Sequence, residues 1–360
     1  LVGYKAEILD ENILNGTIIL ILITCIVASF ATEKAAKKIV VESEDDTEGL
    51  LKSNGAHSEH ILLPIANVSN IEKLLEFAIF IKDKKSANPV SILSVVSNNK
   101  EAEINILKAR NKLEEFVRQA SASETKVNVI TTIDHNPASG IARISKEIMA
   151  DIIILGWPQR TGFIDKLIGE KVDSLLNNTD KTTFICHLEK PLVLHKRIVV
   201  VAPPLTEHEN GFDLWLGKTA KFAKELSIPI ILYCNEATEK AVQKSFKKAK
   251  LTASITVNLF NDWDDFLVLS RHIHQDDLFV LVSARKGATS YIGVLENLPT
   301  KLEKHFTTNS RLVIYPQQFT DNLSSEQYAD ISTEPLNKGI EAVQKIGKGI
   351  GSFFKNKNNE

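Results

Sequence analysis

Three glycines follow an apolar run in the segment LGWPQRTGFIDKLIGEKVDSLL, residues 155–176, and their spacing could serve to bind a phosphate. Gly156 directly follows the run, Gly162 lies in the next stretch, and Gly169 lies where a helix is expected to begin. Where a parallel strand passes through glycines into a helix, backbone N–H groups can converge on an anion, helped by the helix dipole. Glycine permits this close approach because it has no Cβ. The segment therefore predicts an anion site, with a purely structural turn as the alternative.

Other residues that could do chemistry form weaker patterns. Asp134 and His135 follow a predicted strand, where a turn or a helix cap is the more common role of such a pair. His272 and His274 are two residues apart, which places them on different faces of a helix, so a metal site would need ligands from elsewhere. No nucleophile has an evident base nearby. We therefore expect neither an enzyme nor a metal centre.

Ten short aliphatic runs predict the strands that position these residues. The first five lie at 61–66, 89–96, 126–133, 151–156 and 182–188, and the second five at 196–204, 229–234, 253–260, 277–283 and 311–316. Runs that are apolar on both faces are typical of parallel sheets covered by helices. The sequence therefore predicts an α/β fold.

Amphipathic segments between the first five runs predict the covering helices. They lie at roughly 70–82, 99–121, 137–149 and 168–178. Strands and helices in strict alternation imply right-handed crossovers between neighbouring parallel strands. In the segment at 99–121, we expect one apolar face made of Ile104, Leu107, Leu113, Phe116 and Val117.

The order of strands restarts at residue 196, which indicates an internal duplication. Acidic residues stand just before the fourth strand of each copy, in MADIIILG and in HQDDLFVLVS. We expect two like domains, at 60–190 and 196–317, packed side by side. Of the other segments, 41–59 is assigned as an acidic linker and 318–360 as a tail, and 1–40 is considered below.

Charge and cysteine usage exclude several classes of protein. Lys and Arg number 43 against 45 Asp and Glu, so the formal net charge of -2 gives no field that would attract nucleic acid. The three cysteines are Cys25, Cys186 and Cys234. They form no CxxC pair, which argues against a disulfide framework or a structural zinc site and fits a reducing compartment. The tryptophans are scattered and are predicted to be packing residues: Trp157, Trp215 and Trp263.

An uncharged run at 13–31 predicts a transmembrane helix. At a rise of about 1.5 Å per residue it reaches roughly 28 Å, close to the thickness of the hydrocarbon layer. The lysines that follow it, Lys34, Lys37 and Lys38, place everything after about residue 33 in the cytoplasm. A cleaved secretory signal and a buried helix of a soluble core are the alternatives. Because the first residue is Leu1 and the chain enters close to this span, we expect a fragment of a longer polypeptide.

The glycine spacing after the fourth strand resembles that of the universal stress protein family. Its nucleotide-binding members have glycine, two residues, glycine, nine residues, and glycine followed by serine or threonine. Gly156 and Gly169 fall on the outer positions, and Gly162 lies between them. The resemblance covers residues 60–316 and implies two tandem Rossmann-like domains, each with a parallel five-stranded sheet. The transmembrane helix predicted at 13–31 would precede them.

Three departures from the family pattern weaken the case for a nucleotide. Gln159 stands for the middle glycine, Glu170 for the hydroxyl residue, and Ala66 for the acidic residue that ends the first strand. No cofactor is therefore certain. ATP or another adenine nucleotide is the candidate ligand of the first domain, and a loop that has kept the fold but lost the ligand is the alternative.

In the second copy, Ser283, Lys286 and Glu296 take the three glycine positions. Little of the phosphate-binding pattern remains there. The second domain is therefore predicted to be a degenerate copy that serves as a scaffold or in dimerisation.

The first forty residues resemble the end of the membrane domain in the monovalent cation:proton antiporter-2 family. ILNGTIILILITCIVASF is similar to its closing span and FATEKAAKKI to the cytoplasmic stop. The resemblance implies the cytosolic regulatory or dimerisation region of a sodium/proton antiporter in the inner (cell) membrane. Its partners would be the transmembrane domain of the same polypeptide and a second copy of the chain. A soluble tandem universal stress protein that binds ATP, and an adaptor that only dimerises, are the alternatives.

The segment from Pro335 to Lys357 predicts a basic amphipathic helix. Such a helix can lie on an anionic membrane surface, and packing against the tandem domains is the alternative. The predicted membrane-contact residues are Ile340, Val343, Ile346, Ile350, Phe353 and Phe354.

Overall fold

The computed structural model describes residues 16–17, 19–25, 27–28, 32, 58–66, 70–120, 126–157 and 166–318. Within this part of the chain, no helix is long and apolar enough to cross a membrane. The predicted span at 13–31 lies partly outside the described residues and stays a prediction. Most of the linker at 41–59 also lies outside them, as do the tail after residue 318 and its predicted membrane contacts, Ile340, Val343, Ile346, Ile350, Phe353 and Phe354.

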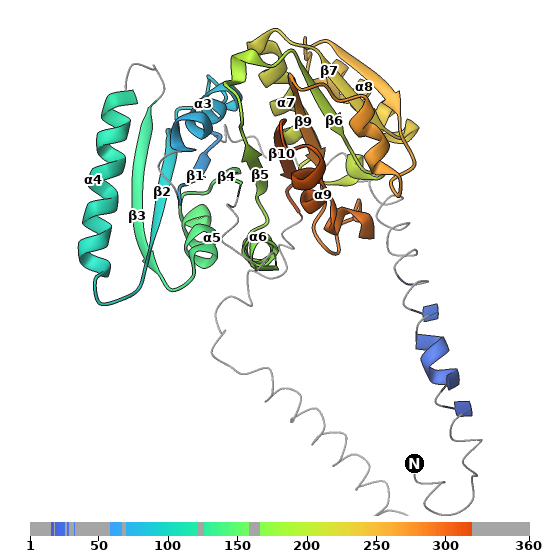
Figure 1. Ribbon diagram of the computed structural model, residues 1–360, viewed down its shortest axis with the longest axis horizontal. Helices are drawn as coiled ribbons and strands as arrows, with labels where there is room; N and C mark the ends of the chain where they lie inside the picture. The colour runs from blue at the N-terminus through green and yellow to red at the C-terminus, as the bar shows by residue number, and fades with distance from the viewer. Residues whose placement is uncertain are drawn as a thin grey trace, which may run out of the picture. The chain divides into compact units, whose positions relative to one another are not determined.

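Ten strands form a single sheet (Figure 1). They are β1 Ile61–Pro64, β2 Val90–Ser97, β3 Val127–Asp134, β4 Ile152–Gly156, β5 Thr182–His187, β6 Arg197–Val201, β7 Ile230–Cys234, β8 Ile255–Leu259, β9 Asp277–Val282 and β10 Ser310–Tyr315. Their order in the sheet is β3-β2-β1-β4-β5-β10-β9-β6-β7-β8. All neighbours run parallel except β5 and β10, which run antiparallel. The predicted strand positions are confirmed, as is a mostly parallel α/β fold.

The two halves of the sheet repeat one strand order. From the outer edge inward, β3-β2-β1-β4-β5 in the first half corresponds to β8-β7-β6-β9-β10 in the second. The sequence predicts two domains side by side, and the structure shows that their strands form one continuous sheet. The join is the pairing of β5 with β10, which sets Arg311 opposite His187. That the second half is a further domain of the same family stays a prediction.

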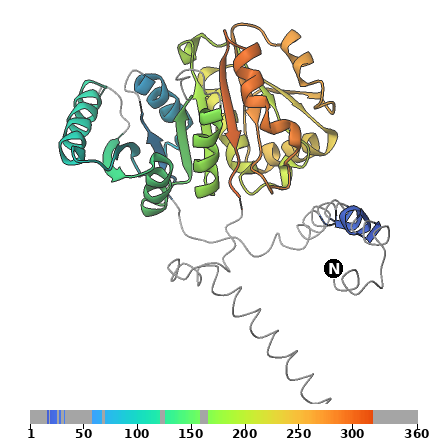
Figure 2. The ribbon, with the colours of Figure 1, turned by 60° about the horizontal axis from the view of Figure 1, so that its bottom comes forward.

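Helices cover both faces of this sheet (Figure 2). They are α3 Ile71–Ile81, α4 Ala102–Ala120, α5 Pro137–Glu147, α6 Lys166–Asn178, α7 Phe212–Leu226, α8 Glu236–Lys248 and α9 Leu298–His305. Alternate strand residues face opposite sides of a sheet. Ile61 therefore belongs to a core with residues of α3, α4, α7 and α8, whereas its neighbour Leu62 packs with α5. A further core includes Phe279 of β9 and residues of α6 and α9.

Aromatic side chains join the two halves on one face of the sheet. Phe77 of α3 lies with its ring centroid 5.9 Å from that of Phe184 in β5, and 5.3 Å from that of Phe222 in α7. Phe80 of α3 meets Phe222 as well, at 5.9 Å. All but Phe80 are almost completely buried. The hydrophobic core is therefore continuous across the join between the halves.

The apolar face expected on α4 is wrong in part. Leu113 is 2% exposed, and Phe116 and Val117 are partly buried, but Ile104 is 56% exposed and Leu107 is 62% exposed. Nine residues make about two and a half helical turns, so Ile104 points away from the side on which Leu113 lies. Leu107 lies six residues before Leu113, which also turns it out of the buried face.

Candidate functional site

The first half has a cavity where its strand order reverses. The carboxyl ends of β1 and β4 lie side by side there, while the helices that follow them leave in different directions, and ligands of open α/β sheets bind at such switch points. The cavity has a volume of about 420 Å³. We call it the apolar pocket. It is lined by the ends of β1, β2 and β4 and the starts of α3 and α5, including Ile65, Ala66, Ser94, Val95, Pro137 and Leu155.

A second cavity lies beside the first, at the join between the halves. We call it the junction pocket; its volume is also about 420 Å³. Four residues line both pockets, namely Asn70, Leu74, Gly156 and Trp157. The other residues of the junction pocket that carry charge or can gain it are Lys73, Cys186, His187, Glu189, Glu303 and Arg311. Glu303 and Arg311 belong to the second half, so this pocket is built by both halves.

Trp157 lines both pockets. Its backbone N–H donates to the carbonyl of Cys186 at 2.7 Å, which fixes the chain at the end of β4. The guanidinium carbon of Arg311 lies 4.9 Å from the Trp157 ring centroid, a cation–π contact, and the ring of His187 meets the indole edge-on at 6.2 Å. Trp157 is thus an aromatic wall that both pockets share.

Charged groups in the junction pocket are held mainly by backbone carbonyls. Lys73 donates to the carbonyls of Leu188 and Glu189 at 2.9 and 3.0 Å. Arg311 is 3% exposed, and its Nη1 donates to the carbonyl of Phe306 at 2.9 Å.

Two titratable groups that line the junction pocket have a shifted pKa, Cys186 and His187. Burial raises the pKa of the Cys186 thiol. Nε2 of His187 lies 3.1 Å from Oε2 of Glu189. Burial lowers the pKa of His187, and the positive charge of Arg311 lowers it further, although Glu189 opposes the shift. The net shift favours the neutral form of the His187 ring.

The structure brings together some of the predicted site residues. Gly156 and Ala66 both line the apolar pocket. A Cβ on Gly156 would lie 3.2 Å from Cδ1 of Leu74, so glycine lets α3 pack closely against the end of β4. Gly169 and Glu170 belong to the first turns of α6.

The remaining predicted residues of this loop, Gln159 and Gly162, lie outside the described residues, as does the side chain of Glu170. Sequence reasoning missed Lys73 and Arg311 and treated Trp157 as packing alone. The position of Trp157, directly after Gly156, is the one local signal that could have placed it at the site.

Asp134 and His135 act in the turn before α5, as expected. Asp134 Oδ1 accepts from the backbone N–H of Asn136 at 3.2 Å. The side chain of Asn136 in turn caps the helix by accepting from the N–H of Ala138 at 3.0 Å. The imidazole of His135 lies 3.1 Å from the amide nitrogen of Asn98. These contacts are structural and require no acid–base role.

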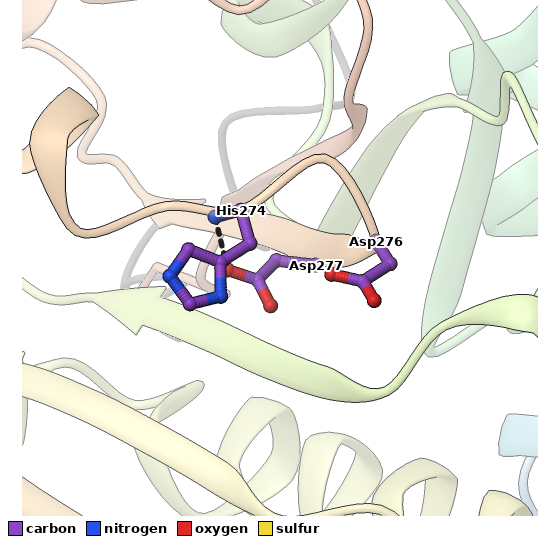
Figure 3. A group of neighbouring side chains, drawn as sticks. All are labelled: His274, Asp276 and Asp277. Carbon is purple, nitrogen blue, oxygen red and sulfur yellow. Dashed lines mark hydrogen bonds between the residues drawn. The ribbon is translucent and has the colours of Figure 1, made fainter.

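His274, Asp276 and Asp277 form the one group of three potential metal ligands found among the described residues (Figure 3). Their ligand atoms lie within 4.8 Å of one another. Both carboxylates are already neutralised, because Arg197 binds Asp277 at 2.6 and 2.8 Å and Lys196 binds Asp276 at 2.7 Å. A cation here would have to displace two ion pairs, so the group is best explained as a structural cluster.

The corresponding switch point of the second half is held by internal contacts. Glu209, in the loop after β6, accepts from both the N–H and the hydroxyl of Ser290, in the loop after β9, at 2.8 Å each. Arg285 is buried nearby, donates to the carbonyls of Pro316 and Lys181, and has its pKa lowered by burial to about 10. These contacts tie together the two loops that would have to receive a ligand.

Ser283, Lys286 and Glu296 of the second copy stand at the three positions where the family pattern has glycine. Ser283 donates its N–H to the carbonyl of Ile314 at 2.8 Å, which continues the pairing of β9 with β10. Lys286 and Glu296 form a surface ion pair at 3.1 Å. All three therefore have structural partners within the second half.

Comparisons with known proteins agree with this architecture. The chain is 26% identical over 332 residues to the Na⁺/H⁺ antiporter NhaS5 of Synechocystis sp., an alignment that covers 82% of this chain and 46% of the antiporter. The chain therefore spans less than half the length of this curated relative. A universal stress protein from Archaeoglobus fulgidus DSM 4304 has the same fold, with a TM-score of 0.50 and 16% identity over 74% of this chain and 98% of that one.

The cytoplasmic domain of a prokaryotic cation chloride cotransporter is also similar, with a TM-score of 0.48 and 15% identity over 71% of this chain and 95% of that one. Residues 57–187, which include the whole first half of the sheet, match the profile of the Universal stress protein family. The chain therefore contains a universal stress protein domain at residues 57–187.

Proposed function

We propose that this chain is the cytosolic regulatory region of a sodium/proton antiporter of the monovalent cation:proton antiporter-2 type, and that its first half binds an adenine nucleotide. The observation that carries the transporter assignment is the extent of the match to the antiporter, 82% of the chain. Residues 58–318 make up less than three quarters of the chain, so the match includes part of the segments that flank the α/β domain.

Membrane attachment through residues 13–31 is supported by the exposure of their apolar side chains. Ile19, Leu20, Ile21, Leu22, Ile23 and Val27 are all between 51% and 62% exposed. Each Å² of apolar surface left in water costs about 25 cal/mol, and a lipid environment would remove that cost. The lysines after residue 33 would then place the α/β domain in the cytoplasm.

Nucleotide binding is supported by the apolar pocket. It lies at the switch point, and among its described lining residues only the side chains of Asn70, Ser94 and Trp157 carry a polar atom, so it suits a base and a sugar. Ala66 offers no carboxylate to the ribose hydroxyls. We therefore expect weaker binding than in relatives that have an acidic residue there, and no hydrolysis.

The second half is proposed to be a tandem copy that serves as a scaffold. The likeness to the protein from Archaeoglobus fulgidus covers 74% of the chain, which one half alone could not supply. Self-association, also proposed, must use a surface other than β5, because β5 already pairs with β10 within the chain. The outer strands of the sheet are β3 and β8.

Two measurements test the proposal. Membrane fractionation should recover the full chain with membranes and a variant that lacks residues 1–40 in the supernatant. Calorimetric titration of the full chain, in a mild detergent, should detect the binding of ATP and of ADP. Gly156→Val should abolish this binding, because the introduced side chain would meet Leu74. Gly293→Val is the matched control, because a Cβ there meets no atom within 4 Å.

Each measurement can refute one part of the proposal. A full chain that stays in the supernatant and binds ATP would favour the soluble tandem stress protein. A chain that sediments with membranes and binds no nucleotide would leave a docking and dimerisation role, and would refute the nucleotide part.

A further inference from the structure

A nucleotide in the apolar pocket needs a place for its phosphates. The described residues that line this pocket include no charged side chain. The loop that carries phosphates in the family departs from the pattern at Gln159 and Glu170. The junction pocket, which shares four lining residues with the apolar pocket, has two cations among its lining residues, Lys73 and Arg311.

We propose that the junction pocket receives the polyphosphate of a nucleotide whose base lies in the apolar pocket, so that the ligand contacts both halves of the chain. The inference rests on the nucleotide binding proposed above. In the family pattern the phosphates lie at the loop after the fourth strand. Here they would instead point toward β5 and β10, away from the loop after β4.

The two pockets are arranged so that one ligand can occupy both. They meet at the first turn of α3 and at the end of β4, where Asn70, Leu74, Gly156 and Trp157 line both. Each has a volume of about 420 Å³, within the usual range for sites that hold small molecules. The Trp157 ring lines both pockets and offers an aromatic face on which a base or a sugar can pack.

Lys73 is the cation best placed to meet a phosphate. It lies in the first turn of α3, whose positive dipole end favours anions. Its hydrogen-bond partners are two backbone carbonyls, and no carboxylate among the described residues forms an ion pair with it. The side chain of Asn70, at the N-cap of α3, makes no capping hydrogen bond and leaves the first turn open to another acceptor.

Arg311 would act from the other half. Its guanidinium is held rigidly by the carbonyl of Phe306 and by the face of Trp157, so little side-chain freedom remains to be lost on binding. Glu189 and Glu303 also line the pocket and would repel a bare polyphosphate. The form expected to bind is therefore the magnesium chelate, because Mg²⁺ is commonly held by one or two carboxylates together with phosphates.

The test compares adenosine with ATP on the full chain in a mild detergent, by calorimetry, with and without Mg²⁺. We expect ATP with Mg²⁺ to bind about tenfold or more tightly than adenosine, since a charged hydrogen bond contributes roughly that factor. Lys73→Gln should lower the affinity for ATP about tenfold and leave that for adenosine unchanged, which also shows that the variant is folded. Lys190→Gln is the matched control, because Lys190 also donates to a carbonyl, at 3.0 Å, but lies outside the pocket.

The outcomes separate this inference from the proposed function. If adenosine and ATP bind equally, or if Lys73→Gln leaves the affinity for ATP unchanged, the phosphates do not use the junction pocket, although the chain still binds a nucleotide. If neither ligand binds, both the nucleotide part of the proposed function and this inference are overturned. An equal loss for Lys190→Gln would also overturn the inference, because it would show a general effect of surface charge.

Discussion

Phe222→Ala is the substitution that tests whether the two halves share one core. The ring of Phe222 in α7 is 2% exposed, and it contacts Phe77 and Phe80 of α3, which belongs to the other half. Removing a buried phenylalanine side chain costs about 3–5 kcal/mol in the free energy of unfolding. Of this, about 0.5–1.5 kcal/mol is specific to each aromatic pair. We therefore expect a loss of about 4 kcal/mol.

A double-mutant cycle isolates the contact across the join. Phe77→Ala and Phe222→Ala should be non-additive by about 1 kcal/mol, because their rings meet edge-on at 5.3 Å. Phe266→Ala is the matched control. It removes a ring that is equally buried, but within the core of the second half, so it should combine additively with Phe77→Ala to within about 0.5 kcal/mol.

Urea denaturation of the full chain, in a mild detergent, measures these free energies. Far-ultraviolet circular dichroism reports on both halves, and tryptophan fluorescence of a Trp157→Phe background reports on the second half alone, through Trp215 and Trp263. One shared core predicts that the two signals change together. Separate transitions, or a coupling between Phe77 and Phe222 below about 0.5 kcal/mol, would show that the halves fold independently and that the reasoning from the continuous sheet is wrong.

Two further changes test local packing and charge. Gly140→Ala in α5 should lower the free energy of unfolding by about 1 kcal/mol, because the added Cβ would lie 2.9 Å from Val95 and this overpacking outweighs the gain in helix propensity. Gly217→Ala in α7 should instead raise the free energy of unfolding by about 1 kcal/mol, because the added Cβ meets nothing within 4 Å. The same denaturation assay measures both changes. Burial lowers the pKa of His60 below 6.5, so the folded chain binds a proton at this residue less readily than the unfolded chain. The contribution of neutral His60 to the free energy of unfolding is therefore fully present above about pH 6.5 and should decrease as the pH falls below that value. His60→Gln should flatten that dependence between pH 7 and 5.5, and an unchanged slope would assign it to other groups.

Buried parallel strands were the part of the fold most open to prediction from sequence. The strands β1, β4 and β9 are apolar on both faces, so their runs stand out against the amphipathic helices between them. The face of α4 was predicted less well, because counting apolar residues near three- and four-residue spacing ignores their accumulated rotation over several turns. Ile104 and Leu107 are exposed for that reason.

The junction pocket could not be predicted in this way. Its charged residues come from α3, the loop after β5, α9 and β10, and only the antiparallel pairing of β5 with β10 brings these elements together. That pairing depends on which strand edges meet, which a local pattern of apolar residues does not encode. Trp157 was likewise predicted to be a packing residue like Trp215, although it is partly exposed and Trp215 is fully buried.

The continuous sheet bears on how a ligand in the first half could influence the second. His187 of β5 and Arg311 of β10 are direct partners in the antiparallel register, and both line the junction pocket. A ligand that contacts both stabilises the arrangement in which the two strands keep this register, by mass action. Control of a transporter requires that this arrangement differ in stability between transporter states, and couplings of about 1–3 kcal/mol are typical. The proposed nucleotide would act directly on the join, so no hinge between the halves is needed for the second half to respond.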